Sequence, residues 1–68
     1  MIIQLNGESK EFAKDITVKA LIQQQTQTDS TTGIAIAING QVVRRALWET
    51  TAFCSGDDVE ILQAVAGG

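Results

Sequence analysis

Two stretches of the chain alternate between large apolar residues and smaller or polar ones, a pattern typical of strands with one buried face. The first five residues place Met1, Ile3 and Leu5 on one side of such a strand. In residues 34–38, three isoleucines alternate with two alanines. The isoleucine face of this second strand is expected to look into the core.

An Asn-Gly dipeptide follows each of these strands, Asn6-Gly7 after the first and Asn39-Gly40 after the second. This dipeptide is favoured in type I′ turns, whose two central residues both need positive φ. The sequence therefore predicts two hairpins, with return strands at residues 8–13 and 41–43. The first return strand is polar and is expected to lie at a sheet edge, with Phe12 as its strongest core candidate.

Between the hairpins, the apolar spacing changes from two to three and four, which indicates one short helix. Its apolar stripe consists of Val18, Leu21 and Ile22. Thr17 is the predicted N-cap, because its hydroxyl can accept a hydrogen bond from an amide of the first turn. We expect the helix to end near Gln25. The polar run at residues 26–32 is predicted to be a loop.

The second hairpin is followed by an irregular helical turn at residues 46–51, in which Leu47 or Trp48 is expected to close one end of the core. Residues 55–58, Ser-Gly-Asp-Asp, have the composition of a turn. The final strand is predicted at residues 59–63. Val59 and Ile61 would face one way, and Glu60 and Leu62 the other.

The order hairpin, helix, hairpin, short connection and strand predicts an α+β domain over residues 1–68. One helix can cover only one face of the sheet. The last strand joins the two hairpins if it lies in the centre, parallel to the first strand, and this arrangement is the β-grasp fold, a five-stranded mixed sheet. The other face would stay open and display Ile2, Ala37 and Leu62, which are candidates for a partner surface.

Composition narrows the chemistry of the chain. Its 68 residues include no histidine and one cysteine, and its net charge is −3. Ser/His and Cys/His nucleophile pairs, His-ligated zinc and an internal disulfide are thereby excluded. The small number of basic residues argues against nucleic acid as a partner, and no apolar run is long enough to span a membrane. We expect a cytoplasmic protein that is monomeric when free and holds no metal or bound cofactor.

The chemistry is expected at the last residues, Val65-Ala66-Gly67-Gly68. Glycine has no Cβ, so a Gly-Gly end can enter a channel that excludes side chains. The α-carboxylate of Gly68 is predicted to be the least hindered carboxylate of the molecule. The tail, residues 64–68, is expected to be flexible in the free protein.

Taken together, these features resemble the ubiquitin-like sulfur carriers of the ThiS/MoaD family, and most closely the members that serve thiamine biosynthesis. The resemblance covers the whole chain. It rests on the Asn6-Gly7 turn, Thr17-Val18 with Leu21-Ile22, residues 37–43 (Ala-Ile-Asn-Gly-Gln-Val-Val), Arg45, Trp48, Gly56-Asp57 and the final Ala66-Gly67-Gly68.

The resemblance implies that Gly68 carries sulfur, that Gly67 lets it enter the channels of partner proteins, and that Ala66 and Val65 line the insertion path. An adenylating enzyme (ThiF-like) would consume ATP-Mg to convert the carboxylate into an acyl-adenylate. A cysteine desulfurase or sulfurtransferase would supply sulfur to form a thiocarboxylate, which a thiazole synthase (ThiG-like) would use. The chain itself would be a carrier and not an enzyme.

Three alternatives stay open at this point: the small sulfur-carrier subunit of molybdopterin synthase, a protein modifier that is joined to lysines, and a β-grasp interaction module. Two side chains need a separate interpretation. Cys54 is predicted to pack in the core or at its rim and not to relay sulfur. Asp57 is predicted to be a local hydrogen-bond acceptor in its turn, although Asp57, Asp58 and Glu60 could also meet a basic partner.

Overall fold

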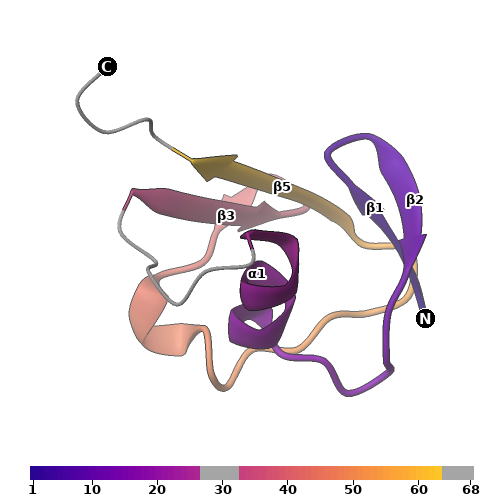
Figure 1. Cartoon of the computed structure of the whole chain (residues 1–68), viewed down its shortest axis with the longest axis horizontal. Coiled ribbons are helices and arrows are strands. Elements are labelled where there is room, and N and C mark those ends of the chain that lie inside the picture. Colours follow the sequence, from indigo (N-terminus) through magenta and orange to yellow (C-terminus); the bar gives the residue numbers. More distant parts are fainter. Residues whose placement is uncertain (27–32, 64–68) are drawn as a thin grey trace.

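The computed structural model describes residues 1–26 and 33–63, which form one five-stranded sheet with a helix packed on one face (Figure 1). The elements in chain order are β1 (Ile2–Leu5), β2 (Glu8–Glu11), α1 (Val18–Thr26), β3 (Ile34–Ile38), β4 (Gln41–Val42), the 3-10 helix η1 (Arg45–Leu47) and β5 (Asp58–Gln63). The spatial order is β2-β1-β5-β3-β4. β5 is parallel to β1 and antiparallel to β3, which confirms the predicted central position of the last strand.

Both predicted hairpin turns have the positive φ angles that type I′ turns require. These are 50° and 85° at Asn6 and Gly7, and 51° and 85° at Asn39 and Gly40. The return strands are shorter than predicted, because β2 ends at Glu11 and β4 at Val42. Further bonds extend each ladder before the chain turns away from the sheet. In the first hairpin the Phe12 amide donates to the Met1 oxygen and the Met1 amine donates to the Phe12 oxygen, and in the second the Val43 amide donates to the Ile36 oxygen.

The helix begins where its first amides find acceptors outside the helix, as every helix N-terminus requires. The Ala20 amide donates to Thr17 Oγ1 at 3.2 Å, which confirms the predicted N-cap. The Val18 and Lys19 amides donate to backbone oxygens of residues 51 and 48, in the segment that follows η1. The helix includes Thr26, one residue beyond the predicted end, and the rest of the predicted loop lies outside the described residues.

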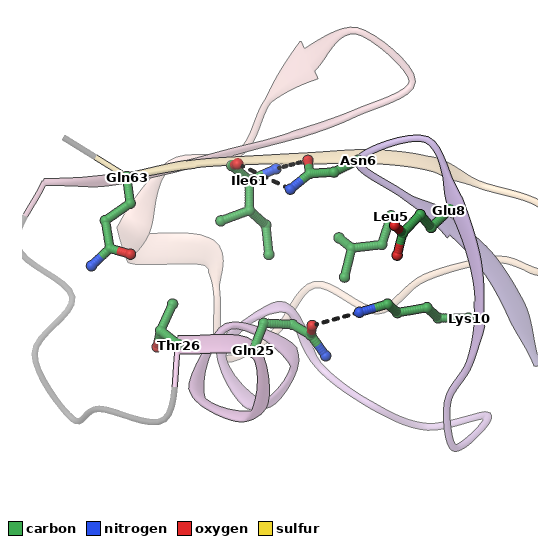
Figure 2. Close-up of a pocket in the computed structure, with 8 residues that line it drawn as sticks. All are labelled: Leu5, Asn6, Glu8, Lys10, Gln25, Thr26, Ile61 and Gln63. Atoms are coloured by element: carbon green, nitrogen blue, oxygen red, sulfur yellow. Dashed lines mark hydrogen bonds between the residues drawn. The ribbon is translucent and has the colours of Figure 1, made fainter. Parts of the chain in front are cut away.

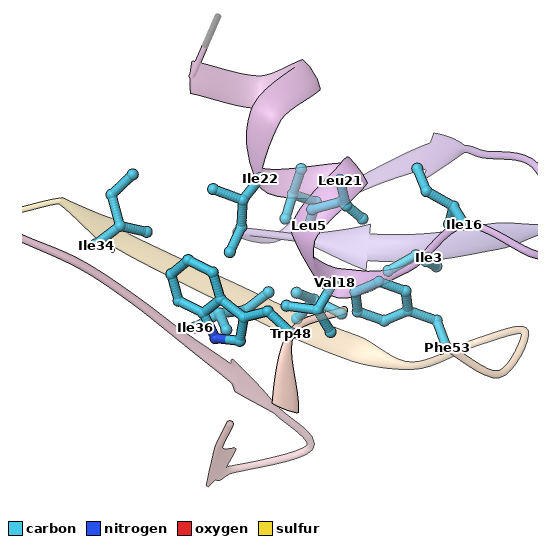
Figure 3. Close-up of a cluster of buried hydrophobic side chains, with 11 residues drawn as sticks. Ile3, Leu5, Ile16, Val18, Leu21, Ile22, Ile34, Ile36, Trp48 and Phe53 are labelled. Atoms are coloured by element: carbon cyan, nitrogen blue, oxygen red, sulfur yellow. The ribbon is translucent and has the colours of Figure 1, made fainter. Parts of the chain in front are cut away.

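The core lies between α1 and the inner face of the sheet (Figure 3). It consists of Ile3, Leu5, Ile16, Val18, Leu21, Ile22, Ile34, Ile36, Trp48, Phe53 and Val59. Two of these, Ile16 and Phe53, were not predicted; they flank an isolated bridge between Thr17 and Ala52, outside any strand or helix stripe. Phe12 and Ile38, both predicted to face the core, are only half-buried because they lie at its margin.

The connection after β4 closes one end of the core with Trp48, and not with Leu47. Trp48 is 3% exposed and Leu47 is 50% exposed. The indole N–H of Trp48 donates to the backbone oxygen of Val43 at 3.0 Å, which satisfies the polar atom of a buried ring. The regular part of this segment is η1, shorter than predicted and one residue earlier.

Candidate functional site

The end of β5 is the part of the described structure that leads to the predicted functional tail. β5 runs through the centre of the sheet and ends at Gln63 (Figure 1). On the β3 side its pairing continues to the very end, where Gln63 lies opposite Ile34. On the β1 side the strand pairing stops at Leu5 and Val59. Within the described residues, the last part of β5 therefore has a neighbouring strand on one side only.

On the β1 side, the side chain of Asn6 continues the contact that the strand backbone no longer makes (Figure 2). The Ile61 amide donates to Asn6 Oδ1 at 2.9 Å, and Asn6 Nδ2 donates to the Ile61 oxygen at 3.4 Å. The backbone amide of Asn6 donates to the Val59 oxygen at 2.9 Å. Asn6 thus contacts the backbone of two residues of β5, Val59 and Ile61, whose backbone groups point toward β1.

An open groove lies beside this contact, between β5, the first hairpin and the end of α1 (Figure 2). Its volume is about 370 Å³, and its lining residues are Leu5, Asn6, Glu8, Lys10, Gln25, Thr26, Ile61 and Gln63. Lys10 Nζ donates to Gln25 Oε1 at 3.4 Å across it. The groove therefore combines one acid, one base and several amides with two apolar side chains. Within residues 1–26 and 33–63, no group of three or more His, Cys, Asp or Glu side chains is placed to hold a metal ion.

The face of the sheet away from the helix carries an apolar patch close to the end of β5. We call it the outer patch, and it consists of Ala35, Ala37, Val42 and Leu62. Leu62 lies opposite Ala35, and Val42 lies opposite Ala37, so the four side chains are neighbours. Leu62 is 66% exposed and Val42 is 74% exposed. Glu60, which faces Ala37, places a carboxylate at its border.

Two of the three residues predicted for the partner surface lie close together in the structure, and the third lies apart from them. Ala37 and Leu62 belong to the outer patch. Ile2 is also exposed, at 54%, but its oxygen accepts from the Gly56 amide, level with the start of β5. At ~3.3 Å per residue, the positions from Gly56 to Leu62 span roughly 20 Å. Val42 was not among the residues predicted for the partner surface, although the two-residue turn at Asn39-Gly40 fixes it opposite Ala37.

The turn before β5 is organised by the carboxylate of Asp57, as predicted. Asp57 Oδ2 accepts from the Cys54 amide at 2.8 Å, and Asp57 Oδ1 accepts from Asn39 Nδ2 at 3.1 Å. The prediction that Cys54 packs in the core or at its rim is wrong, because Cys54 is exposed and belongs neither to the core nor to the apolar residues packed against it. The neighbouring Phe53 takes the buried position, and the following residue of an extended chain points outward.

A second, smaller hollow of about 310 Å³ lies beside the start of α1 and is lined by Lys19, Arg45, Ala46, Trp48 and Glu49. The Arg45 guanidinium carbon is 5.6 Å from the centre of the Trp48 ring, and Lys19 Nζ is 2.7 Å from Glu49 Oε1. The hydrogen bond and charge of Lys19 lower the pKa of the Glu49 carboxyl. Lys19 and Glu49 therefore form an ion pair at the surface, so each charged side chain has a partner within this chain.

The residues predicted to carry the chemistry, Val65, Ala66, Gly67 and Gly68, lie outside the described residues, as does the rest of the segment predicted to be flexible. What the structure describes is the strand that leads to them and the two surfaces that flank its end, the groove and the outer patch. In residues 1–26 and 33–63, no helix has the length and apolar character needed to cross a bilayer.

In the described part of the chain, the sheet order, the one α-helix and the parallel pairing of the first and last strands define a β-grasp protein of the ubiquitin-like class. A crystal structure of the thiamine biosynthesis protein ThiS from Geobacter metallireducens has the same fold, with a TM-score of 0.76, 24% identity and 100% of both chains covered. An NMR structure of a thiamine biosynthesis protein from that organism has a TM-score of 0.74 and 24% identity, covering 100% of this chain and 88% of the other.

Sequence comparison defines the family within this class. The sequence model of the ThiS family matches residues 3–68. The sulfur carrier protein ThiS of Escherichia coli (strain K12) is 35% identical over 68 residues, and the match covers 100% of each chain. The chain therefore belongs to the ThiS family.

Proposed function

We propose that this chain is a sulfur carrier protein of thiamine biosynthesis, and that its working group is the α-carboxylate of Gly68. The observation that carries the proposal is the full-length match to a sulfur carrier of the same family, which includes the Gly67-Gly68 end. The fold supports it, since β5, the central strand of the sheet, ends at Gln63, the fifth residue before Gly68.

The proposed chemistry starts from a carboxylate, which is a poor electrophile because attack on it must expel oxide. A carboxylate oxygen of Gly68 attacks the α-phosphate of ATP, pyrophosphate leaves, and an acyl-adenylate forms. A sulfur nucleophile then attacks the acyl carbon and displaces AMP. If the sulfur belongs to a persulfide, reduction of the resulting acyl disulfide by a thiol releases the thiocarboxylate. The chain supplies the acyl group and accelerates none of these steps, so it is a co-substrate and not an enzyme.

The proposed partners are an adenylating enzyme that consumes ATP-Mg, a cysteine desulfurase or sulfurtransferase, and a thiazole synthase. Gly67 would admit the end of the chain to their channels, and Ala66 and Val65 would line the inserted segment. We place these reactions in the cytoplasm, where ATP is available and an exposed free thiol such as Cys54 stays reduced.

The outer patch is the proposed docking surface for the adenylating enzyme. Leu62 lies next to the point at which the strand ends, and with Val42 it presents most of the exposed aliphatic surface on this side of the sheet. Contiguous exposed apolar surface with a charged border is typical of protein interaction sites. The Glu60 carboxylate favours a partner with a basic group at the matching position. Ile2 lies at the far end of the same face, so a substitution there shows how far the interface extends.

The decisive experiment is the intact mass of the chain after incubation with ATP, a sulfur source and lysate of its host. We expect a mass increase equal to the replacement of one oxygen by sulfur in the full chain, and none in a variant without Gly68. A chain whose mass does not change, or changes equally without Gly68, contradicts the proposal. Attachment of the chain to lysines of other proteins would show a modifier instead.

Docking is tested separately with Leu62→Glu and its matched control Ile2→Glu, which places the same charge on the same face at the other end. We expect Leu62→Glu to raise the KM for the carrier in adenylation about tenfold or more, because burial of a charge is costly. Ile2→Glu should leave the KM within about twofold if the interface is confined to the outer patch. Equal effects of the two variants would contradict this location.

A further inference from the structure

The two Asn-Gly turns of this chain do more than reverse its direction, since each asparagine also holds a different part of β5. Asn6 binds the backbone of Ile61, near the exit of the strand. Asn39 binds at its start, where Asn39 Oδ1 accepts from the Asp58 amide at 2.9 Å and Asn39 Nδ2 donates to Asp57 at 3.1 Å. The two turns therefore fix the two ends of the central strand.

We propose that Asn6 is a positioning residue for the reactions at Gly68. Its side-chain amide makes the hydrogen bonds that the next residue of β1 would make, and so it holds the C-terminal part of β5 in place. This inference rests on the function proposed above. Strand pairing between β1 and β5 ends at Leu5 and Val59. Beyond that point, within the described residues, the hydrogen bonds from Asn6 to Ile61 are what connect β5 to β1.

The geometry of the contact is that of a strand backbone. In a parallel pair, one residue accepts from and donates to the flanking residues of its neighbour. Asn6 already donates through its backbone amide to Val59, and its side-chain amide then offers an acceptor and a donor to Ile61, the next residue of β5 whose backbone groups point toward β1. The 2.9 Å bond from the Ile61 amide is the stronger of the two side-chain bonds, since hydrogen bonds weaken with distance.

Turn geometry alone does not account for this asparagine. Position 6 has a φ of 50°, which glycine, aspartate and asparagine all adopt. Glycine has no side chain to reach β5. Aspartate keeps an acceptor for the Ile61 amide but turns an anionic oxygen toward the Ile61 carbonyl oxygen. Only asparagine gives the turn and both hydrogen bonds.

The consequence concerns the direction in which the chain leaves the sheet. Gln63, the last residue of β5, is two positions after Ile61 and is paired on the β3 side alone. If Ile61 is released, the end of β5 can move away from the first hairpin, and the point from which the chain continues shifts relative to the outer patch. A partner docked on that patch would then receive the terminal carboxylate less often in a reactive position.

The test compares Asn6→Gly with Asn39→Gly, a matched control that removes the same amide from the same turn type at the other end of β5. Both variants keep a residue suited to positive φ. Amide hydrogen exchange by NMR is measured at Ile61 and Val59, and adenylation kinetics are measured with the adenylating enzyme and ATP.

For Asn6→Gly we expect faster exchange at Ile61 with little change at Val59, and a roughly tenfold lower kcat with a nearly unchanged KM for the carrier, since small misplacements of a reacting group have large effects on rate. Asn39→Gly should leave kcat within about twofold while it lowers the unfolding midpoint in urea by a comparable amount, which excludes a mere loss of stability. Asn6→Asp, which keeps the acceptor for the Ile61 amide, should restore most of kcat.

Equal values of kcat for the two glycine variants, or unchanged exchange at Ile61 in Asn6→Gly, would overturn the inference. If Asn6→Gly does not fold, Asn6→Ser, whose shorter side chain lacks the amide, is measured in its place with Asn6→Asp as the reference that keeps the acceptor. An unchanged exchange rate at Ile61 in Asn6→Ser would then overturn the inference. If the wild-type chain is not adenylated, the proposed function fails, while the exchange rates at Ile61 still decide whether Asn6 holds the strand.

Discussion

Replacement of Trp48 by phenylalanine should destabilise the fold measurably, because the structure gives the indole ring three separate contacts. Its N–H bond to the Val43 oxygen is worth about 0.5–1.5 kcal/mol net. The Arg45 guanidinium over the ring contributes about 0.5–1 kcal/mol, part of which phenylalanine retains. The smaller ring also leaves space in a site that is 97% shielded from solvent, which costs on the order of 1 kcal/mol.

Together these contributions predict a loss of about 1.5–3 kcal/mol in the free energy of unfolding. The total free energy of unfolding of a domain of 68 residues is roughly 3–10 kcal/mol, so the predicted loss is a large share of it. The expected decrease in Tm is about 4–8 °C for each kcal/mol lost. The assay is urea unfolding followed by far-ultraviolet circular dichroism, because the substitution removes the single tryptophan that fluorescence would use.

Leu47→Ala is the control, since Leu47 is the adjacent residue in the chain and half of its side chain is already in solvent. It should cost about 1 kcal/mol or less. If Trp48→Phe unfolds at the wild-type urea concentration, or if Leu47→Ala costs more than Trp48→Phe, the indole does not close the core as described. The reasoning about the segment after β4 would then be refuted.

Two further predictions concern the surface. The carboxyl pKa of Glu49 should lie below its ordinary value in the wild type and rise in Lys19→Met, as followed by NMR titration. Because this pKa is lowered in the folded state, the ion pair stabilises the fold at a pH above the pKa that Glu49 has in the unfolded chain. This stabilisation is lost as the pH falls through the lower pKa of the folded state. An unchanged pKa in Lys19→Met would contradict the pairing. The exposed Cys54 thiol should react with a thiol reagent in the folded protein as fast as in urea, and Cys54→Ser should still acquire sulfur; protection of the thiol until unfolding would show that it is buried.

Much of the fold could be predicted because its elements have clear periodic or turn signals. The alternating strands, the helix stripe and the Asn-Gly turns all lie where the sequence places them. The core residues Ile16 and Phe53 could not be predicted in this way, since they lie in connections without a repeating pattern. Their burial depends on how the segments around the Thr17–Ala52 bridge come together, which is a property of the assembled chain.

The surroundings of the site were only partly predictable for the same reason. Ala37 and Leu62 could be assigned to the open face from alternation alone, but their separation from Ile2 depends on the register between β1 and β5. The exposure of Cys54 follows from the neighbouring Phe53, whose burial no periodic signal indicates. The contact between Asn6 and Ile61 joins residues that are far apart in the chain, and turn preferences already favour an asparagine at that position, so no sequence signal indicates the contact.

The central position of β5 also has a consequence for biosynthesis of the protein. Each hairpin joins strands that are adjacent in the chain, so each can form as soon as its own residues leave the ribosome. Among the described strands, only β5 pairs with both hairpins, and it is made after them. Until residues 58–63 arrive, β1 and β3 each present an unpaired edge, where a nascent chain is most exposed to pairing with another chain. Because β5 both completes the sheet and leads to the proposed carrier end, a chain that has not yet folded has no fixed platform from which to present that end.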